Sequence, residues 1–355
     1  MLEGLTGHEI DQRDADAHGS VQIAVVRRQG CMTTIHHSIF LPTGFMGELG
    51  EGDPVAAHAH LTDLVLTAER CGFHTAWVLD HLHTVPPSQA NLFECWTLVA
   101  GLLRDTSRLR VGNLVTANGY RHPVIQAKMA ATADVLGNGR LTFGIGAGWY
   151  EPDFAALGIP FADGPARLRQ LGEALQIIRS LWTQEQTSFS GEHYQVHGAT
   201  GAPRRPHVPI MVAGGGEKVT LPLVARYGDQ CNMLAGPKDL ERKFAIIDRH
   251  CEAIGRDPAQ IHRTATTTCL VADTDEQALA QFPPGAGDLW DGDVREYGLI
   301  GSPDTIRERI AGYAAAGVDE LIIGFAMPDL TEAVRRYADE FIAAGTPGIS
   351  RGRRC

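Results

Sequence analysis

The sequence lacks long hydrophobic runs and any cysteine pattern typical of a disulfide framework. No stretch comes near the roughly 18 consecutive apolar residues that a transmembrane helix needs. The seven cysteines are scattered without a C-x-x-C pair, and such an odd, dispersed set is typical of a reducing compartment. The first residues also lack the basic start and apolar run of a signal peptide. We therefore expect a cytoplasmic protein without a membrane partner.

Positive charge is also scarce. The chain has 31 Lys and Arg residues against 42 Asp and Glu residues, which gives a net charge of −11. Nucleic acids and anionic membranes are bound through basic surfaces, so this balance argues against both and leaves a small organic molecule as the expected partner. Arginine is clustered only at Arg351, Arg353 and Arg354, in residues 346–355, which we expect to be a flexible tail.

Several catalytic motifs are missing. The fifteen histidines include no H-E-x-x-H motif, and the pairs His36-His37 and His81/His83 have no spaced third ligand. We therefore expect no metal site. The absence of G-x-S-x-G removes support for a hydrolase with a nucleophile elbow.

A hydrophobic content of 44% over 355 residues is enough to fill one large core. Residues 1–31 are charged and rich in Gly and His, so we expect a disordered extension there, outside a single domain at 32–345. Met32 directly precedes the first convincing strand, and whether it is the true start stays open.

Short apolar runs alternate with helical patterns along this domain. Gly, Pro or Asp bounds most of the runs, as is typical of buried parallel strands. They lie at residues 35–41, 75–79, 109–116, 141–147, 208–213, 229–234, 264–272 and 320–325. Helical spacing follows at 61–68, with Gly72 as a stop, and at 168–182. Asp329 is expected to cap a last helix with Leu330, Val334, Tyr337 and Phe341 on its apolar face.

Eight strands alternating with helices predict an α/β fold, a (β/α)₈ TIM barrel. An open doubly wound sheet is the alternative. Two stretches are too long for simple crossovers and predict insertions after strands 4 and 7. The first, 151–206, contains an expected hairpin at 187–196; the second, 282–302, is rich in Gly, Pro and Asp and is interpreted as a flexible loop.

Candidate functional residues follow the strands, because active sites of such barrels lie at the carboxyl ends of strands. Asp80 and His81 follow the second strand, and the fourth ends in Gly146, Ala147, Gly148 and Trp149. The fifth strand ends in Ala213, Gly214, Gly215 and Gly216, with Glu217 expected to open a helix whose amino end favours a phosphate. Each has a structural alternative: Asp80 as a helix cap or the partner of an Arg, and the glycines as turn formers. Trp77, Trp96 and Trp182 are interpreted as core residues.

At these residues the sequence resembles the bacterial luciferase-like family, and within it the class that uses coenzyme F420. The resemblance extends from about residue 35 to 341. The matching stretches include W-V-L-D-H at 77–81, residues 112–123, G-A-G-W-Y-E at 146–151, residues 174–182, 188–194 and 225–229, and P-I-M-V-A-G-G-G at 209–216. It implies a TIM barrel with insertions, in agreement with the strand pattern.

The resemblance also implies roles for individual residues. Asp80 and His81 would approach the deazaflavin ring, with His81 either in acid–base catalysis or only in a hydrogen bond to the ring. Leu114 and Val115 would lie behind the ring, joined by a non-prolyl cis peptide. The turns from Gly146 to Trp149 and from Ala213 to Gly216 would bind the ribityl phosphate portion.

Two departures from the family are visible. Relatives that oxidise a sugar phosphate have Glu where this chain has Trp149, which disfavours that reaction here. Many relatives have Thr-Gly where this chain has Asn113-Leu114, so the side chain of Leu114 changes the wall of the expected pocket.

Three functions follow from these patterns. The first is an F420-dependent oxidoreductase that transfers hydride to or from a small organic substrate, and the second is a monooxygenase that uses reduced FMN and oxygen. The third is a non-catalytic cofactor-binding protein, against which the retained Asp80 and His81 argue. A homodimer stays open, since relatives often dimerise.

Overall fold

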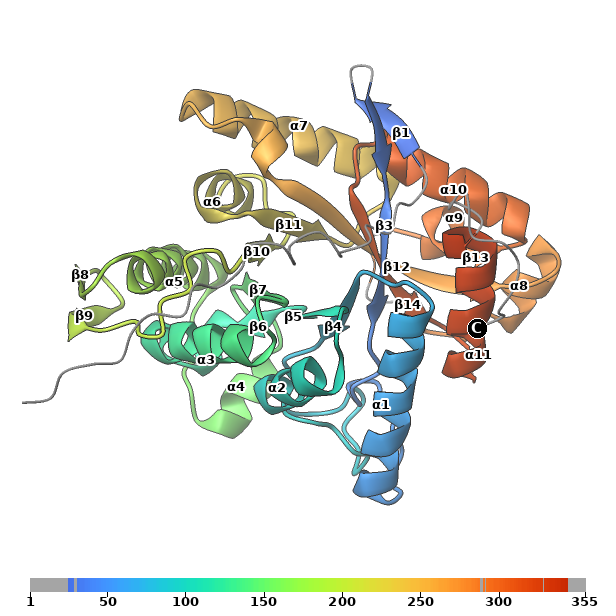
Figure 1. The fold of residues 1–355 in the computed structure, drawn as a ribbon, viewed down its shortest axis with the longest axis horizontal. Helices are drawn as coiled ribbons and strands as arrows, with labels where there is room; N and C mark the ends of the chain where they lie inside the picture. Colours follow the sequence, from blue (N-terminus) through green and yellow to red (C-terminus); the bar gives the residue numbers. More distant parts are fainter. Residues whose placement is uncertain (1–24, 29–30, 288–289, 291, 328, 344–355) are drawn as a thin grey trace, which may run out of the picture.

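Eight parallel strands close into a barrel in the computed structural model of the chain (Figure 1), which describes residues 25–28, 31–287, 290, 292–327 and 329–343. The barrel strands are β3 (His36–Phe40), β4 (Thr75–Val78), β5 (Arg110–Asn113), β7 (Leu141–Gly146), β10 (Ile210–Ala213), β11 (Gln230–Met233), β12 (His262–Val271) and β14 (Glu320–Phe325). Because β10 pairs in parallel with both β7 and β11, the sheet has no open edge at this point. The closed ring confirms the predicted barrel and excludes the open sheet, and each strand lies where the hydrophobic pattern placed it.

A ring of helices surrounds the barrel (Figure 1). It consists of α1 (Pro54–Arg70), α2 (Cys95–Asp105), α3 (Pro123–Leu136), α5 (Gly164–Thr183), α6 (Thr220–Tyr227), α7 (Pro237–Ala253), α10 (Pro303–Ala315) and α11 (Leu330–Tyr337). The predicted cap is confirmed, since the side chain of Asp329 accepts a hydrogen bond from the backbone N–H of Glu332 at 3.0 Å. A π-helical turn, η3 (Ala338–Ile342), continues α11 and buries Phe341.

Polar caps and prolines fix where several helices begin. Asp53 accepts from the backbone N–H of Val55 at 3.1 Å just before α1, and Asp163 accepts from Ala166 at 2.7 Å at the start of α5. Proline occupies the first turn of α1, α3, α5, α7 and α10, where its missing N–H has no intrahelical partner to lose. These residues therefore define where the loops after the strands end and the helices begin.

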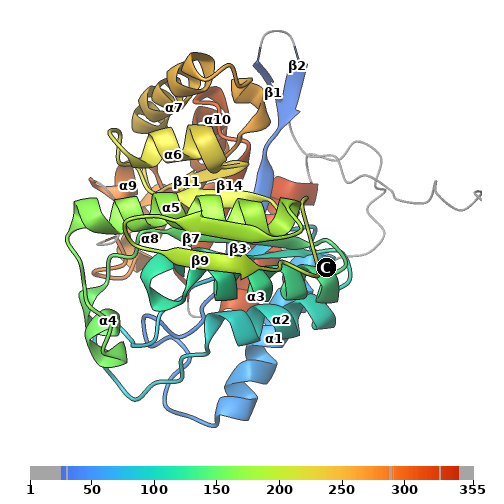
Figure 2. The same ribbon diagram turned by 90° about the vertical axis from the view of Figure 1, so that its left-hand side faces the viewer.

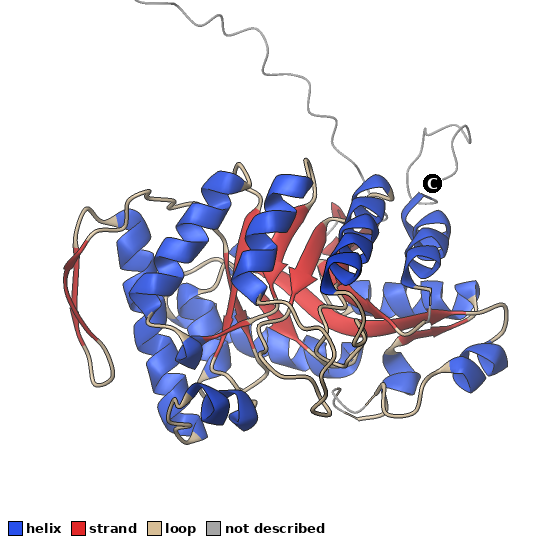
Figure 3. Cartoon of the chain, turned by 90° about the horizontal axis from the view of Figure 1, so that it is seen from below, coloured by secondary structure: helices blue, strands red, loops and turns tan. Residues whose placement is uncertain are grey.

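The insertion after β7 is an arm beside the barrel. It contains α4 (Glu151–Leu157), α5 and an antiparallel hairpin of β8 (Thr187–Ser190) and β9 (Gln195–Ala199), which confirms the predicted hairpin. Figures 2 and 3 show the hairpin packed along α5, at the edge of the molecule. The hydroxyl of Tyr194, in the hairpin turn, accepts a hydrogen bond from Asn118 Nδ2 at 3.1 Å and so connects the arm to the barrel.

The insertion after β12 has more structure than the sequence suggested. It begins with α8 (Asp275–Gln281), and residues 282–302, expected to be a flexible loop, contain α9 (Val294–Tyr297) and β13 (Leu299–Gly301). β13 pairs in parallel with the end of β12, in the register Cys269↔Leu299, and Leu299 and Ile300 are buried. The loop prediction is therefore wrong in this part, because the Gly, Pro and Asp residues around it conceal a short buried strand.

The expected N-terminal extension is only partly described. Within residues 1–31, β1 (Val25–Arg28) pairs antiparallel with β2 (Cys31–Thr34), a hairpin that the sequence analysis did not predict. Residues 1–24 and the expected tail at 346–355 lie outside the described residues.

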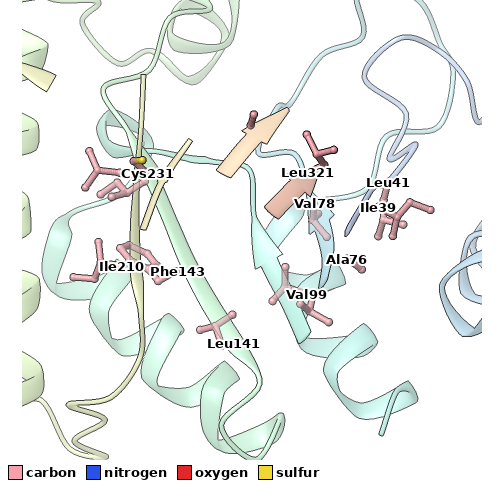
Figure 4. Close-up of a cluster of buried hydrophobic side chains, with 14 of the residues drawn as sticks. Ile39, Leu41, Ala76, Val78, Val99, Leu141, Phe143, Ile210, Cys231 and Leu321 are labelled. Carbon is pink, nitrogen blue, oxygen red and sulfur yellow. The ribbon is translucent and has the colours of Figure 1, made fainter. Parts of the chain in front are cut away.

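Two apolar layers hold the barrel. The outward-facing side chains of the strands pack against the helices, and Figure 4 shows part of this layer, including Ile39, Val78 and Phe143. Inside the barrel a smaller cluster contains Trp77, Leu114, Met211 and Ile322. Burial of each such large side chain contributes about 1.5–3 kcal/mol. The core assignment of Trp77, Trp96 and Trp182 is confirmed.

Trp77 connects the interior to the amino-terminal end of the barrel. A Cβ on Gly112 would lie 2.5 Å from the indole ring, so only glycine leaves room for it there. The indole Nε1 donates to Glu320 Oε1 at 3.2 Å, and Ser38 Oγ donates to the same oxygen at 2.6 Å. Burial alone would raise the pKa of Glu320, but bonds from His262 and Ser38 outweigh it and hold the pKa well below its usual range.

The described residues contain no helix long and apolar enough to cross a bilayer. Cys95, Cys231, Cys251 and Cys269 are buried and have free thiols, and Cys71 is buried as well.

Candidate functional site

The predicted site residues gather at the carboxyl ends of neighbouring strands. A short strand, β6 (Thr116–Ala117), pairs with β7 in the register Ala117↔Gly146, and β7 pairs with β10 in the register Val212↔Ile145. The turns after β4, β5, β7 and β10 therefore occupy one side of the carboxyl-terminal rim of the barrel. The sequence placed these residues on that rim, and the strand order brings them together.

Asp80 forms an ion pair with Arg121. Its Oδ2 and Oδ1 accept from Arg121 Nη1 at 2.7 Å and Nη2 at 3.0 Å, and Oδ2 also accepts from Thr116 Oγ1 at 2.7 Å. Arg121 in turn donates to Glu94 at 2.8 Å. With its carboxylate buried and both oxygens occupied, Asp80 matches the alternative of an Arg partner that holds the rim together.

His81 is held by Asp153, a residue that the sequence analysis did not single out. Asp153 lies in the first turn of α4, and its Oδ2 accepts from His81 Nδ1 at 2.9 Å. A carboxylate only accepts hydrogen bonds, so Nδ1 carries the proton and Nε2 is left to serve a ligand. The imidazole is nearly buried and lies in the neighbourhood of the expected cofactor turns.

Asp153 accepts hydrogen bonds from two segments of the chain. Besides His81, its oxygens accept from His83 Nδ1 at 2.7 Å, from the Tyr120 hydroxyl at 2.8 Å and from the backbone of Leu82 at 3.3 Å. Burial would raise the pKa of this carboxyl group, but these hydrogen bonds outweigh it and lower the pKa to about 2. The carboxylate is therefore a fixed negative charge behind His81.

Three aromatic rings surround the imidazole. Phe45, in the loop after β3, stacks on His81 with ring centroids 4.1 Å apart, and Trp149 and Tyr150 contact it edge-on at 5.7 and 5.6 Å. Trp149 is 58% exposed, so much of its indole is open to solvent beside the imidazole. Sequence reasoning missed Phe45, because a single Phe in a Gly-rich loop carries no periodic signal.

The Leu114–Val115 peptide is cis, as the family resemblance implied. Val115 fills the space beside two glycines of β7. A Cβ on Gly144 would lie 1.9 Å from the backbone oxygen of Asn113, and a Cβ on Gly146 would lie 2.9 Å from Val115 Cγ2. Part of the glycine pattern of β7 therefore accommodates the protein's own bulge.

Two turns with uncommitted backbone donors lie side by side on this rim. Gly148 and Gly214 have φ values of 81° and 122°, so turn geometry requires glycine at both. Among the described residues, none accepts a hydrogen bond from the backbone N–H of Gly148, Trp149, Gly215 or Gly216. The second turn leads into α6, which begins at Thr220. The expectation that Glu217 opens the helix is therefore wrong by three residues, since residues 217–219 form a turn first.

No group of three or more His, Cys, Asp or Glu side chains is arranged for a metal ion in the part of the chain that the structure describes. A surface pocket of about 230 Å³ lies elsewhere, between α7 and the end of α10, and is lined by Phe244, Asp248 and Arg263 among others. On the rim, the groups left without a protein partner among the described residues include Nε2 of His81 and the backbone donors of the two turns.

The family model of luciferase-like monooxygenases matches residues 35–292. The F420-dependent glucose-6-phosphate dehydrogenase of Kineococcus radiotolerans is 32% identical over 229 residues, which cover 63% of this chain and 67% of the relative. The FMNH(2)-dependent dimethylsulfone monooxygenase of Pseudomonas putida is 29% identical over 299 residues, which cover 74% and 81% of the two chains.

A solved structure shows the same fold. An F420-dependent secondary alcohol dehydrogenase in complex with an F420-acetone adduct superposes with a TM-score of 0.73 at 20% identity, over 89% of this chain and 99% of that one. The relatives named above are oxidoreductases, and the matched family model covers most of the barrel. The chain belongs to the luciferase-like monooxygenase family.

Proposed function

We propose that this chain is an F420-dependent oxidoreductase that transfers hydride between the deazaflavin cofactor and a small, uncharged organic substrate. The proposal rests on the arrangement around His81. A buried carboxylate orients its imidazole, and two turns with free backbone N–H groups lie on the same rim. When bound, such a cofactor supplies a flat ring that accepts or gives a hydride.

The rim has the features that a ring with a ribityl phosphate needs. The backbone N–H groups of Gly148 and Trp149 and those of Gly215 and Gly216 belong to turns after adjacent strands, so they can donate to one phosphate group. The cis peptide at Leu114–Val115 places a bulge beside β7, where it would form the wall behind the ring. The residues therefore fit the group that the named relatives use.

His81 is proposed as the residue that moves a proton at the substrate oxygen. Removal of hydride from an alcohol carbon leaves a proton on the oxygen, which Nε2 of His81 can accept, and the reverse reaction returns it. The negative charge of Asp153 stabilises the imidazolium that forms. Asp80 has a positioning role, because its carboxylate already accepts hydrogen bonds from Arg121 and Thr116.

The surroundings of His81 favour an uncharged substrate. Phe45, Trp149 and Tyr150 provide aromatic surface beside the imidazole, and the charge of Arg121 is already compensated by Asp80 and Glu94. A sugar phosphate would bring two negative charges to this surface. Its oxidation is disfavoured also because Trp149 stands where the sugar-phosphate oxidising relatives have Glu.

A second candidate is an FMN-dependent monooxygenase, supported by the match to the dimethylsulfone monooxygenase, which covers 74% of this chain. FMN presents a similar ring and a ribityl phosphate, so the same turns suit it. Deazaflavin does not activate oxygen, so oxygen uptake during turnover supports the monooxygenase.

Titration of the purified protein with F420 and with FMN, followed by ring absorbance and fluorescence, tests the cofactor. We expect F420 to bind with micromolar or better affinity. Micromolar binding of FMN without binding of F420 would overturn the F420 assignment, and absence of binding to either would overturn the function. Screening alcohols and carbonyl compounds against oxidised and reduced F420 then identifies the substrate and the direction of transfer.

A further inference from the structure

A buried lysine lies over the glycine turn after β10. Lys243 is on α7, and a Cβ placed on Gly215 would lie 2.6 Å from its Nζ and 3.4 Å from its Cε. The ammonium group therefore occupies the space that a side chain at position 215 would fill. Only 10% of the Lys243 side chain is exposed, although lysine is rarely buried unless its charge has a partner.

The charge of Lys243 is only partly compensated. Its Nζ lies 2.9 Å from Asp239 Oδ2, one turn earlier on the same helix. Asp239 is shared, because its Oδ1 accepts from Arg242 Nη2 at 2.6 Å. An ammonium group has three N–H donors, and no second acceptor from the described residues pairs with that of Lys243. A buried cation with unused donors thus adjoins a turn whose own N–H groups are unused.

We infer that Lys243 is a specificity-determining residue that supplies the positive charge for the phosphate of the cofactor at Gly214–Gly216. The inference rests on the proposed function and deepens it, since it assigns the recognition of the anionic part of the cofactor to one side chain. The backbone donors of the turn position the phosphate, and Lys243 contributes a charge-assisted hydrogen bond. The ring itself would be held elsewhere, by the turns after β4 and β5.

Gly215 has a second role under this inference. A side chain there would push the ammonium group away from the turn, so glycine at 215 keeps Lys243 in place as well as leaving the backbone open. Thr220 lies against the neighbouring position, where a Cβ on Gly216 would be 2.9 Å from its Oγ1. The turn is thus enclosed by one cationic and one hydroxyl side chain.

The test compares ligands that differ only in phosphate. Affinities of FMN and riboflavin are measured by fluorescence quenching for the wild type and for Lys243→Met, Lys243→Arg and Arg242→Met. We expect Lys243→Met to weaken FMN binding at least tenfold while riboflavin binding stays within about twofold. Lys243→Arg should restore most of the loss. Arg242→Met removes a neighbouring charge that is half exposed, and should leave the FMN-to-riboflavin ratio unchanged.

If the wild type binds only deazaflavins, the ribityl deazaflavin replaces riboflavin and its 5′-phosphate replaces FMN. An equal loss for both ligands of a pair, or no loss for either, would overturn the role of Lys243. Failure of the wild type to bind any of these rings would instead overturn the proposed function, so the two failures are distinguishable. Gly215→Ala provides a second measurement, with a selective loss for the phosphorylated ligand expected because the ammonium group is displaced.

Discussion

Oδ2 of Asp153 accepts a hydrogen bond from Nδ1 of His81 at 2.9 Å, across a separation of 72 residues in the chain. The first residue belongs to the insertion after β7 and the second to the turn after β4. This pair fixes which nitrogen of the imidazole faces the site, so it determines whether His81 can act as a base.

Replacement of His81 by Ala is expected to lower turnover at least tenfold, about 1.4 kcal/mol of transition-state stabilisation, while the fold is retained. The measurement is the steady-state rate with F420 and the identified substrate, with circular dichroism as the check of folding. His83→Ala is the matched control, because His83 bonds the same carboxylate but has a half-exposed side chain. Its turnover should fall much less, and equal losses for the two variants would remove His81 from the mechanism.

Asp153→Asn is expected to lower kcat at least tenfold with little change in cofactor affinity. The amide removes the negative charge that stabilises a protonated His81 and turns one acceptor into a donor that faces His83 or Tyr120. The pH dependence of kcat is the decisive measurement, since loss of the charge should shift the acidic limb of the pH–rate profile to lower pH. An unchanged pH profile together with a lower kcat would indicate a purely structural role.

Asp80→Asn should destabilise the protein by about 3 kcal/mol, because it leaves Arg121 partly buried without its main partner. Chemical denaturation of the apoprotein measures the loss without any ligand. Glu94→Gln changes the other, more exposed partner of Arg121 and should cost about 1 kcal/mol or less. Similar stabilities of Asp80→Asn and the wild type would contradict the proposed role of this ion pair in the rim.

Gly144→Ala should prevent correct closure of the barrel. A Cβ there would lie 1.9 Å from the backbone oxygen of Asn113, so β5 or β7 would have to shift, at a cost above the roughly 1–3 kcal/mol of ordinary overpacking. Gly164→Ala at the start of α5 is the control, because no heavy atom lies within 4 Å of its Cβ position. Soluble yield and unfolding midpoint distinguish the two, and a Gly144→Ala variant as stable as Gly164→Ala would show the close approach to be wrong.

Acid should destabilise the fold through His37. Burial, and then the nearby His36, lower the pKa of His37 to about 3, whereas an unfolded histidine titrates near 6.5. The unfolded chain therefore binds a proton that the folded chain does not. The stability is complete above about pH 6.5 and decreases as the pH falls toward 3, by up to about 1.4 kcal/mol per pH unit for this group.

Urea denaturation at several pH values between 4 and 7 measures this slope. His37→Gln keeps a hydrogen-bond partner for the Tyr337 hydroxyl but does not titrate, so its stability should change less with pH. Hydrogen bonding to Glu320 outweighs burial and raises the pKa of His262. This shift stabilises the fold at lower pH, and it is present in both the variant and the wild type. Equal slopes for the variant and the wild type would refute the role of His37.

The pattern of the strands was enough to predict the barrel, because each buried strand is a short apolar run between turn residues. The rim was also predictable, since Asp80, Gly146 and Gly214 lie at or just beyond the carboxyl ends of strands. Asp153 was not, because an acidic residue in the first turn of a helix is ordinary, and only the tertiary fold brings it to His81. The neutralisation of Asp80 by Arg121 likewise depends on strand order, which a local pattern does not contain.

Three long-range hydrogen-bonded connections of the rim involve one short turn, η1 (Asn118–Tyr120), and the residue after it. Asn118 bonds the arm through Tyr194, Tyr120 bonds Asp153, and Arg121 bonds Asp80. An insertion or deletion of one residue here would displace all three anchors at once. Homologous chains with this architecture should therefore keep the length of this turn constant.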